Sequence, residues 1–177
     1  MSFMEAYRDT FTHYVKTMVF LRDHTEESIR LELWDTQLLG ESIQDIFRMD
    51  LVSYMLYVAS AEGDIPDHML NVIYGCTDLD LPKVRLRDFA RREELLDDSF
   101  AQHVPATFLY ALYVDQYASA EICGPEGGSL LQQFVDFYEE VTDHLLQACG
   151  GREEPYLRRA HAFWDHLLEK LQQFADT

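Results

Sequence analysis

The chain has few basic residues for its length. It contains 14 Lys and Arg against 32 Asp and Glu in 177 residues, and its formal net charge is −18 at pH 7. Proteins that bind nucleic-acid phosphates carry clusters of Lys and Arg, so we expect no nucleic-acid partner. Attachment to anionic lipid through a basic surface is excluded for the same reason. The charge is compatible with binding of a cation or a basic protein, or with high solubility alone.

Long hydrophobic runs and cysteine pairs are also missing. The longest strongly apolar stretch, Leu51–Ala61, has 11 residues, whereas a membrane-spanning helix needs about 20. Residues 1–16 carry scattered charges and no apolar segment after a basic start, so no signal peptide is predicted. The three cysteines, Cys76, Cys123 and Cys149, form no CxxC motif and are interpreted as structural thiols in a reducing compartment. We therefore expect a cytoplasmic protein without direct membrane insertion.

Hydrophobic residues recur at the spacing of helices, and they make up 47% of the chain. Two stripes of apolar residues, each spaced by three and four positions, flank the pair Gly150-Gly151. The glycines are typical of a helix end, and Glu153 and Glu154 suit the start of the next helix, so an αα-hairpin is predicted. The stripes consist of Leu131, Phe134, Tyr138, Val141, Leu145 and Ala148, and of Leu157, Ala160, Trp164, Leu167, Leu171 and Phe174.

Earlier segments follow the same rhythm, and we find no convincing alternating strand. One helix is predicted from Ser42, as N-cap, to near Gly63, and another from Asp80, as N-cap. The whole chain, 1–177, is predicted to be a single all-α domain, a bundle of about seven to eight helices. It has an N-terminal helical extension over 1–40 and a core over 42–174. Further helices are predicted over 2–22, 25–39, 66–74 and 93–100 and from Pro105 onward, with a loop over 121–128.

The chain aligns with itself at an offset of 87 residues. This offset places the sequence Ala61-Glu62-Gly63 on Ala148-Cys149-Gly150, and Val58 on Leu145. Apolar residues meet apolar residues on both arms of the hairpins, which predicts two pseudo-symmetric αα-hairpins. The alternative is that any two amphipathic hairpins align in this way, because helical periodicity is generic.

Three carboxylates crowd the predicted turn between two helices. Glu62, Asp64 and Asp67 lie within six residues, and Gly63 between them allows a sharp turn. A hard cation such as Ca²⁺ or Mg²⁺ relieves the repulsion of such a group through oxygen coordination. The alternative is that Asp64 or Asp67 caps the next helix and stabilises its positive end.

The stretch from Leu51 to Ile65 resembles the signature of the tellurite-resistance TerB-like family. In that family an apolar helix ends in Ala-Asp-Gly, and an apolar and an acidic residue follow. The stretch from Pro105 to Asp115 is similar to the Pro-led helix of the larger members, and Ala148-Cys149-Gly150 is similar to a second copy of the signature. The resemblance covers residues 45–174 and implies an all-helical fold.

Two departures bear on what the resemblance implies. The aspartate before glycine is replaced by Glu62 in the first copy and by Cys149 in the second. A family cation site would therefore keep at most Glu62, Asp64, Asp67 and Asp115, with a divalent cation of the Ca²⁺ or Mg²⁺ class as ligand, and the second site would be lost. The resemblance implies a non-catalytic role in a stress response through an unidentified protein partner, with no catalytic residue and no certain cofactor.

Two other functions remain open on the sequence. One is a metal-dependent enzyme with carboxylate ligands inside the bundle, although the chain contains no Glu-x-x-His of the di-iron bundles. The other is an acidic mimic of nucleic acid that inhibits a basic partner, with the acidic runs 93–98 and 136–140 as candidates. Such runs are also typical of ordinary solvated helix faces.

Overall fold

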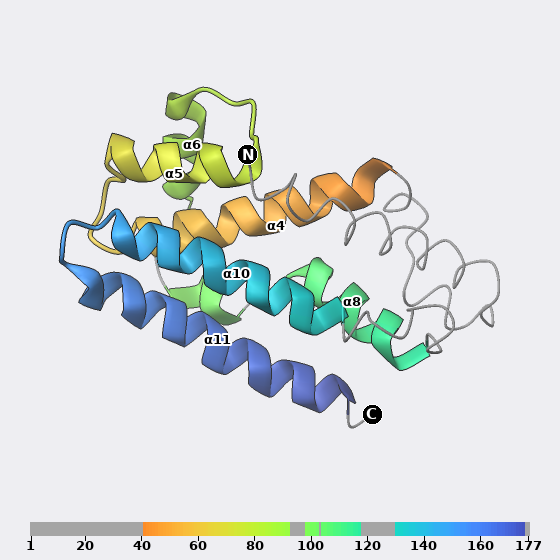
Figure 1. The fold of residues 1–177 in the computed structure, drawn as a ribbon. Coiled ribbons are helices and arrows are strands. Elements are labelled where there is room, and N and C mark those ends of the chain that lie inside the picture. Colours follow the sequence, from red (N-terminus) through yellow and green to blue (C-terminus); the bar gives the residue numbers. More distant parts are fainter. Residues whose placement is uncertain (1–40, 93–97, 103, 118–129, 176–177) are drawn as a thin grey trace.

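A computed structural model describes residues 41–92, 98–102, 104–117 and 130–175 of the chain (Figure 1). This described part is all-helical and contains no strand, which confirms the predicted all-α class. The helices predicted over 2–22 and 25–39 and the loop over 121–128 lie outside it. The helices are α4 (Glu41–Ala59), α5 (Asp67–Thr77), α6 (Lys83–Ala90), the 3₁₀ helix η2 (Asp98–Gln102), α8 (Ala106–Tyr117), α10 (Leu130–Gln147) and α11 (Glu153–Ala175).

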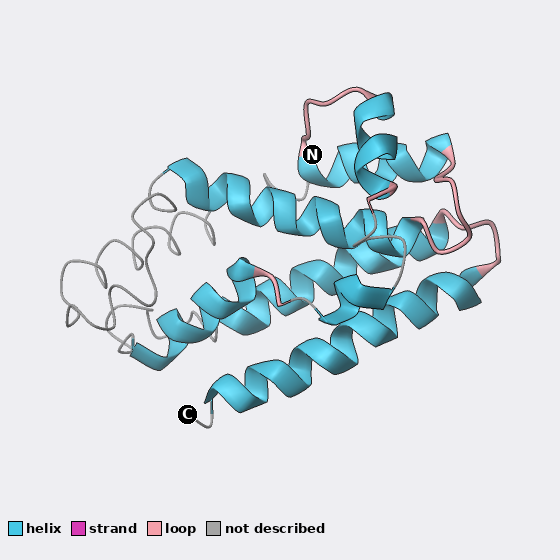
Figure 2. Cartoon of the chain, turned by 180° about the vertical axis from the view of Figure 1, so that it is seen from behind, coloured by secondary structure: helices cyan, strands magenta, loops and turns pink. Residues whose placement is uncertain are grey.

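Helix α4 lies at the centre of the bundle and packs against α5, α6, α8, α10 and α11 (Figures 1 and 2). Its residues from Leu51 to Ala59 are almost all buried, so the apolar stretch noted in the sequence is largely a core helix. Helices α5 and α6 sit at one end, next to the turn that follows α4. None of the described helices combines the length and the low polarity that crossing a bilayer requires.

Prolines mark three helix starts. Pro66 and Pro82 occupy the N-cap positions of α5 and α6 with φ of −64° and −68°, and Pro105 directly precedes α8. The prediction of Asp80 as N-cap is wrong, because the Pro82 ring disfavours a helical conformation for the residue before it. The prediction of Ser42 as N-cap is also wrong, because α4 already includes Glu41.

The predicted hairpin of α10 and α11 is confirmed. Gly150 and Gly151 have φ of +67° and +89° between the two helices, a conformation that L side chains rarely adopt. Val58 on α4 and Leu145 on α10 are fully buried, as the two apolar stripes require. The relation of the two hairpins by pseudo-symmetry stays a prediction. Of the short helix predicted over 93–100, residues 98–100 belong to η2, and 93–97 lie outside the described part.

Aromatic side chains fill the centre of the bundle. Tyr54 on α4 lies 4.7 Å from Phe163 on α11 and 5.0 Å from Tyr138 on α10, measured between ring centroids. Phe108 brings α8 to the same cluster, with its ring 4.8 Å from that of Tyr138 in an edge-on arrangement. Such pairs add stability beyond the area that they bury. The cluster therefore joins the four long helices.

A chain of hydrogen bonds crosses this core. The Thr142 hydroxyl donates to the Tyr138 carbonyl oxygen at 2.7 Å, so the Tyr54 hydroxyl, 2.6 Å from Thr142 Oγ1, acts as donor to it. The Trp164 indole N–H in turn donates to the Tyr54 oxygen at 3.3 Å. Burial raises the pKa of Tyr54 to about 12. The Tyr138 hydroxyl, also buried, has no hydrogen-bond partner in the structure as described.

This contrast predicts different effects on the free energy of unfolding for the same substitution at two neighbouring tyrosines. Tyr54→Phe removes the hydroxyl that links Thr142 and Trp164 by hydrogen bonds. It should lower the free energy of unfolding by about 1–2 kcal/mol, because the Trp164 N–H loses its acceptor. Tyr138→Phe removes a buried hydroxyl without a partner, so the free energy of unfolding should stay unchanged or rise. Urea denaturation of both variants tests this. A loss in Tyr138→Phe as large as that in Tyr54→Phe would contradict it.

Candidate functional site

The turn between α4 and α5 carries three of the four predicted cation ligands. The Gly63 N–H donates to the Ser60 carbonyl oxygen at 3.0 Å, and Gly63 has a φ of +107°. Two residues later the Ile65 side chain is buried in the core. The buried Ile65 side chain holds the turn against the core, while Glu62 and Asp64 are exposed. The acids are therefore presented on the surface, next to α6.

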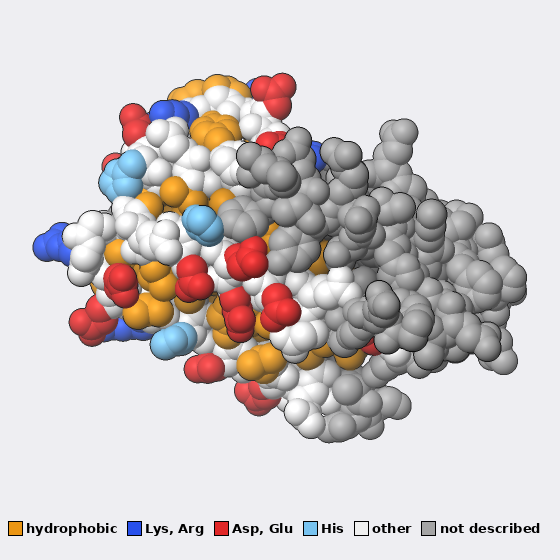
Figure 3. Space-filling model, viewed as in Figure 1, with side chains coloured by type: hydrophobic (Ala, Val, Ile, Leu, Met, Phe, Trp, Pro, Cys, Tyr) orange, Lys and Arg blue, Asp and Glu red, His pale blue; other side chains and the backbone are white. Residues whose placement is uncertain are grey.

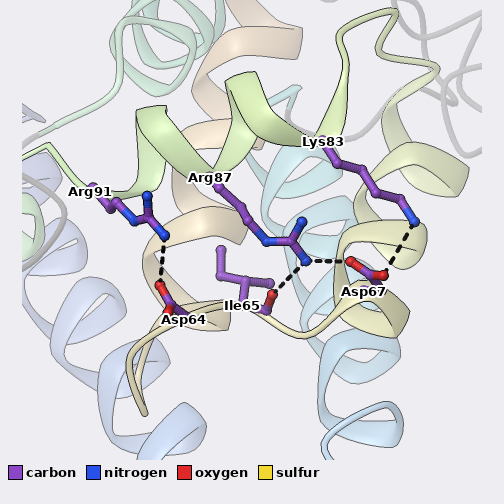
Figure 4. Close-up of polar contacts among 6 residues, drawn as sticks. All are labelled: Asp64, Ile65, Asp67, Lys83, Arg87 and Arg91. Atoms are coloured by element: carbon purple, nitrogen blue, oxygen red, sulfur yellow. Dashed lines mark hydrogen bonds and ion pairs between the residues drawn. The ribbon is translucent and has the colours of Figure 1, made fainter.

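Two cations of α6 and Arg91, its C-cap residue, hold this turn from the other side (Figure 4). Lys83, Arg87 and Arg91 follow one another at intervals of four residues, which places them on one face of the helix. Arg87 donates to the Ile65 carbonyl oxygen at 3.3 Å and to the Asp67 carboxylate. Arg91 donates to Asp64 Oδ1 at 3.2 Å, and Lys83 Nζ lies 4.0 Å from Asp67 Oδ2. We call these three cations and their two acids the arginine clamp.

Within the clamp, the negative charges of Asp64 and Asp67 are balanced by the three neighbouring cations. The hydrogen bond from Arg87, followed by the charge of Lys83, lowers the pKa of Asp67 below its usual value. The acids of this turn therefore already have neutralising cations from the chain itself. A shallow depression of about 280 Å³ lies beside the clamp, and Ser60, Gly63 and Ala90 contribute to its walls.

Glu62 and Asp115, the two predicted ligands outside the clamp, lie in different surroundings. Glu62 Oε2 is 3.7 Å from a guanidinium nitrogen of Arg152, at the start of α11. Asp115 is on α8, and its Oδ2 accepts a hydrogen bond from the Leu131 N–H at 3.0 Å, in the first turn of α10. The structure thus brings Asp64 and Asp67 to one clamp, directs Glu62 to the α10–α11 turn, and uses Asp115 as a helix cap. Within the described ranges no three His, Cys, Asp or Glu side chains are grouped so that they could hold a metal ion.

The cation hypothesis remains testable at the clamp. A divalent ion bound to Asp64 and Asp67 must displace two guanidinium groups, so we expect Arg91→Gln to raise the apparent affinity several-fold. Calorimetric titration with Ca²⁺, Mg²⁺, Mn²⁺ and Zn²⁺ measures this, with Glu62→Gln/Asp64→Asn as the matched variant. Equal heats from the wild-type protein and from that variant would remove the turn as a cation site.

The cysteines that the structure describes are placed as structural thiols. Cys76 is buried on α5, and burial raises the pKa of its thiol to about 11, which suppresses the reactive thiolate. Cys149 is half-buried after α10, and its thiol donates to the Leu146 carbonyl oxygen at 2.8 Å. Cys123 lies outside the described residues.

The clustering of basic charge on α6 was not predicted. Five of the 14 Lys and Arg of the whole chain fall within residues 83–92, although the net charge of −18 argued against a basic surface for nucleic acid or anionic lipid. Counting cations in ten-residue windows would have found the cluster. Its partners at the turn lie 16 to 27 residues away in sequence, so the contacts become visible only in three dimensions.

Comparison of this chain with protein-family models, with curated proteins and with solved structures finds no significant match.

Proposed function

We propose that the chain is a non-catalytic helical module that acts by contact with another protein. The observation that carries the proposal is the outer face of α6, where apolar side chains reach into solvent beside arginines. Val84 is 63% exposed and Leu81, just before the helix, is 39% exposed. In the described part of the chain, the one other large hydrophobic residue exposed to this degree is Leu168 on α11. Apolar and basic groups at one place are typical of contact surfaces.

The clamp supports the same proposal in a second way. It ties α6 to the α4–α5 turn through charged groups on the inner side of the helix. The outer side is thereby held in a fixed orientation, which lowers the conformational cost of binding. The resemblance to TerB-like proteins supports a stress response as the context of this contact.

A second candidate is an acidic surface for a basic partner, and a band of acidic side chains favours it (Figure 3). Asp136, Glu139, Glu140 and Asp143 are exposed on α10, a helix that contains no Lys or Arg. This surface lies on a different helix from the outer face of α6, so the two candidates can be tested separately.

Site-specific photo-cross-linking in cells tests both candidates. A photoreactive benzoylphenylalanine is introduced at Val84, at Glu139 and, as a reference position, at Leu168. We expect a covalent adduct of defined mass at Val84 under stress conditions. An adduct at Glu139 alone, with a basic protein, would favour the acidic surface. Irradiation that yields unmodified chain at all three positions would contradict the proposed function.

A further inference from the structure

We propose that a groove between α4 and α6 binds a short acidic segment of a partner protein, anchored by apolar side chains. This inference rests on the proposed function and names the chemistry of its partner. The groove has a volume of about 350 Å³. We call it the α6 groove. Its lining consists of Met49, Val52, Leu81, Arg85, Leu86, Asp88, Phe89 and Arg92.

The floor of the α6 groove is apolar. Val52 and Leu86 are buried in the core beneath it, and Met49 and Phe89 are half-buried at its walls. A floor of this kind gains free energy when apolar side chains replace water against it. Leu81 on its lining is 39% exposed and provides further apolar contact for a bound segment. The occupant must therefore carry apolar anchors as well as charge.

The charge at the groove comes from two arginines that the clamp does not use. Arg85 and Arg92 are exposed, and no described carboxylate forms an ion pair with either of them. The Arg92 guanidinium lies 4.3 Å from the centroid of the Phe89 ring, which orients it beside the apolar wall. Asp88 is the acid in the lining, and its Oδ1 lies 3.9 Å from a guanidinium nitrogen of Arg91 in the clamp. Two guanidinium groups beside an apolar floor complement acidic residues that flank apolar anchors.

The net charge of the chain restricts the occupant to a short segment. Electrostatic interactions are screened beyond roughly 8 Å at physiological ionic strength. A short acidic segment that lies in the groove interacts with Arg85 and Arg92 within this distance. The whole chain carries a net charge of −18. A nucleic acid or an anionic membrane extends beyond the groove and is repelled by the acidic rest of the molecule. A second copy of the chain carries the same excess of negative charge.

The test uses the full chain and a synthetic fluorescent peptide. The peptide is helical, with Leu at positions i, i+3, i+4 and i+7 and Glu at the flanking positions. Two matched peptides replace Glu by Lys or Leu by Ser. Fluorescence anisotropy measures binding to the wild-type chain and to the variants Leu81→Ser and Arg85→Glu/Arg92→Glu, which change residues of the lining. The control variants are Leu168→Ser and Arg158→Glu on α11, which change an exposed apolar and an exposed basic residue elsewhere.

We expect the Glu/Leu peptide to bind the wild-type chain and both control variants equally. Binding should weaken about tenfold or more in each groove variant, and for each matched peptide. Circular dichroism and thermal melts confirm that the variants are folded. Equal binding by all variants, or tighter binding of the Lys peptide, would overturn the proposal.

Three further outcomes would also overturn it. One is binding of an anionic vesicle or an oligonucleotide with the same dependence on Arg85 and Arg92. The next is a concentration-dependent dimer in sedimentation that Leu81→Ser abolishes, because a second copy would then occupy the groove. The last is the absence of any binding by the Glu/Leu peptide. If cross-links still form in cells at Val84 while the Glu/Leu peptide does not bind, the proposed function stands and the inference about the α6 groove fails alone.

Discussion

Replacing Arg159 with methionine is expected to lower the free energy of unfolding by about 2–3 kcal/mol. Arg159 is half-buried on α11 and donates to the Tyr57 carbonyl oxygen at 2.6 Å and to Ser60 Oγ at 2.8 Å. Both acceptors lie at the carboxyl end of α4, where the helix dipole favours a cation. The guanidinium also lies 4.8 Å from the centroid of the Tyr57 ring. Methionine keeps much of the apolar volume and removes these polar interactions.

The neighbouring Arg158 provides a matched control. Its guanidinium lies 3.3 Å from Glu154 one turn earlier, and the side chains of both residues are largely exposed. Such surface pairs contribute about 0.5 kcal/mol or less, so Arg158→Met should leave the unfolding midpoint almost unchanged. Chemical denaturation of both variants measures the difference. Equal losses of unfolding free energy in Arg159→Met and Arg158→Met would show that Arg159 does not stabilise the protein through the end of α4.

The sequence was sufficient to predict most of the helices. The regular stripes of α10 and α11 depend on local spacing alone, and the burial of Leu145 and Leu167 confirms the predicted face. Prolines and glycines marked helix ends because they restrict or permit backbone angles at their own positions. Errors occurred at N-caps. Asp80 has the right chemistry for a cap, but the proline two residues later prevents the helix from starting there.

Side-chain contacts between distant helices could not be predicted in this way. Asp115 is an acid near the end of a predicted helix, and its chemistry is compatible with a cation ligand. Its observed role depends on the packing of α8 beside the first turn of α10. The same holds for Arg48, which donates to the Thr77 carbonyl oxygen at the end of α5 from 29 positions earlier. Acids reach helix starts and arginines reach helix ends, as helix dipoles favour, but the pairing is set by the tertiary arrangement.

Asp50 is expected to show the second large effect, because it caps a helix whose own N-terminus lacks a capping side chain. Its Oδ2 accepts hydrogen bonds from the Thr107 N–H at 3.0 Å and from the Thr107 hydroxyl at 2.6 Å. Thr107 is the second residue of α8, and Pro105 before the helix has no hydrogen-bonding side chain. An aspartate from α4 therefore supplies the contact that an N-cap residue usually makes.

Asp50→Ala should lower the free energy of unfolding by about 2 kcal/mol, because it leaves the buried Thr107 hydroxyl without its acceptor. Asp50→Asn retains an acceptor oxygen and loses only the charge, so a smaller loss is expected. In a Thr107→Val background the alanine substitution should cost less, since the hydroxyl is already absent. A double-mutant cycle by urea denaturation measures this coupling. Additive effects of Asp50→Ala and Thr107→Val would mean that the carboxylate stabilises the bundle through contacts other than the Thr107 hydroxyl, such as its hydrogen bond from the Thr107 N–H.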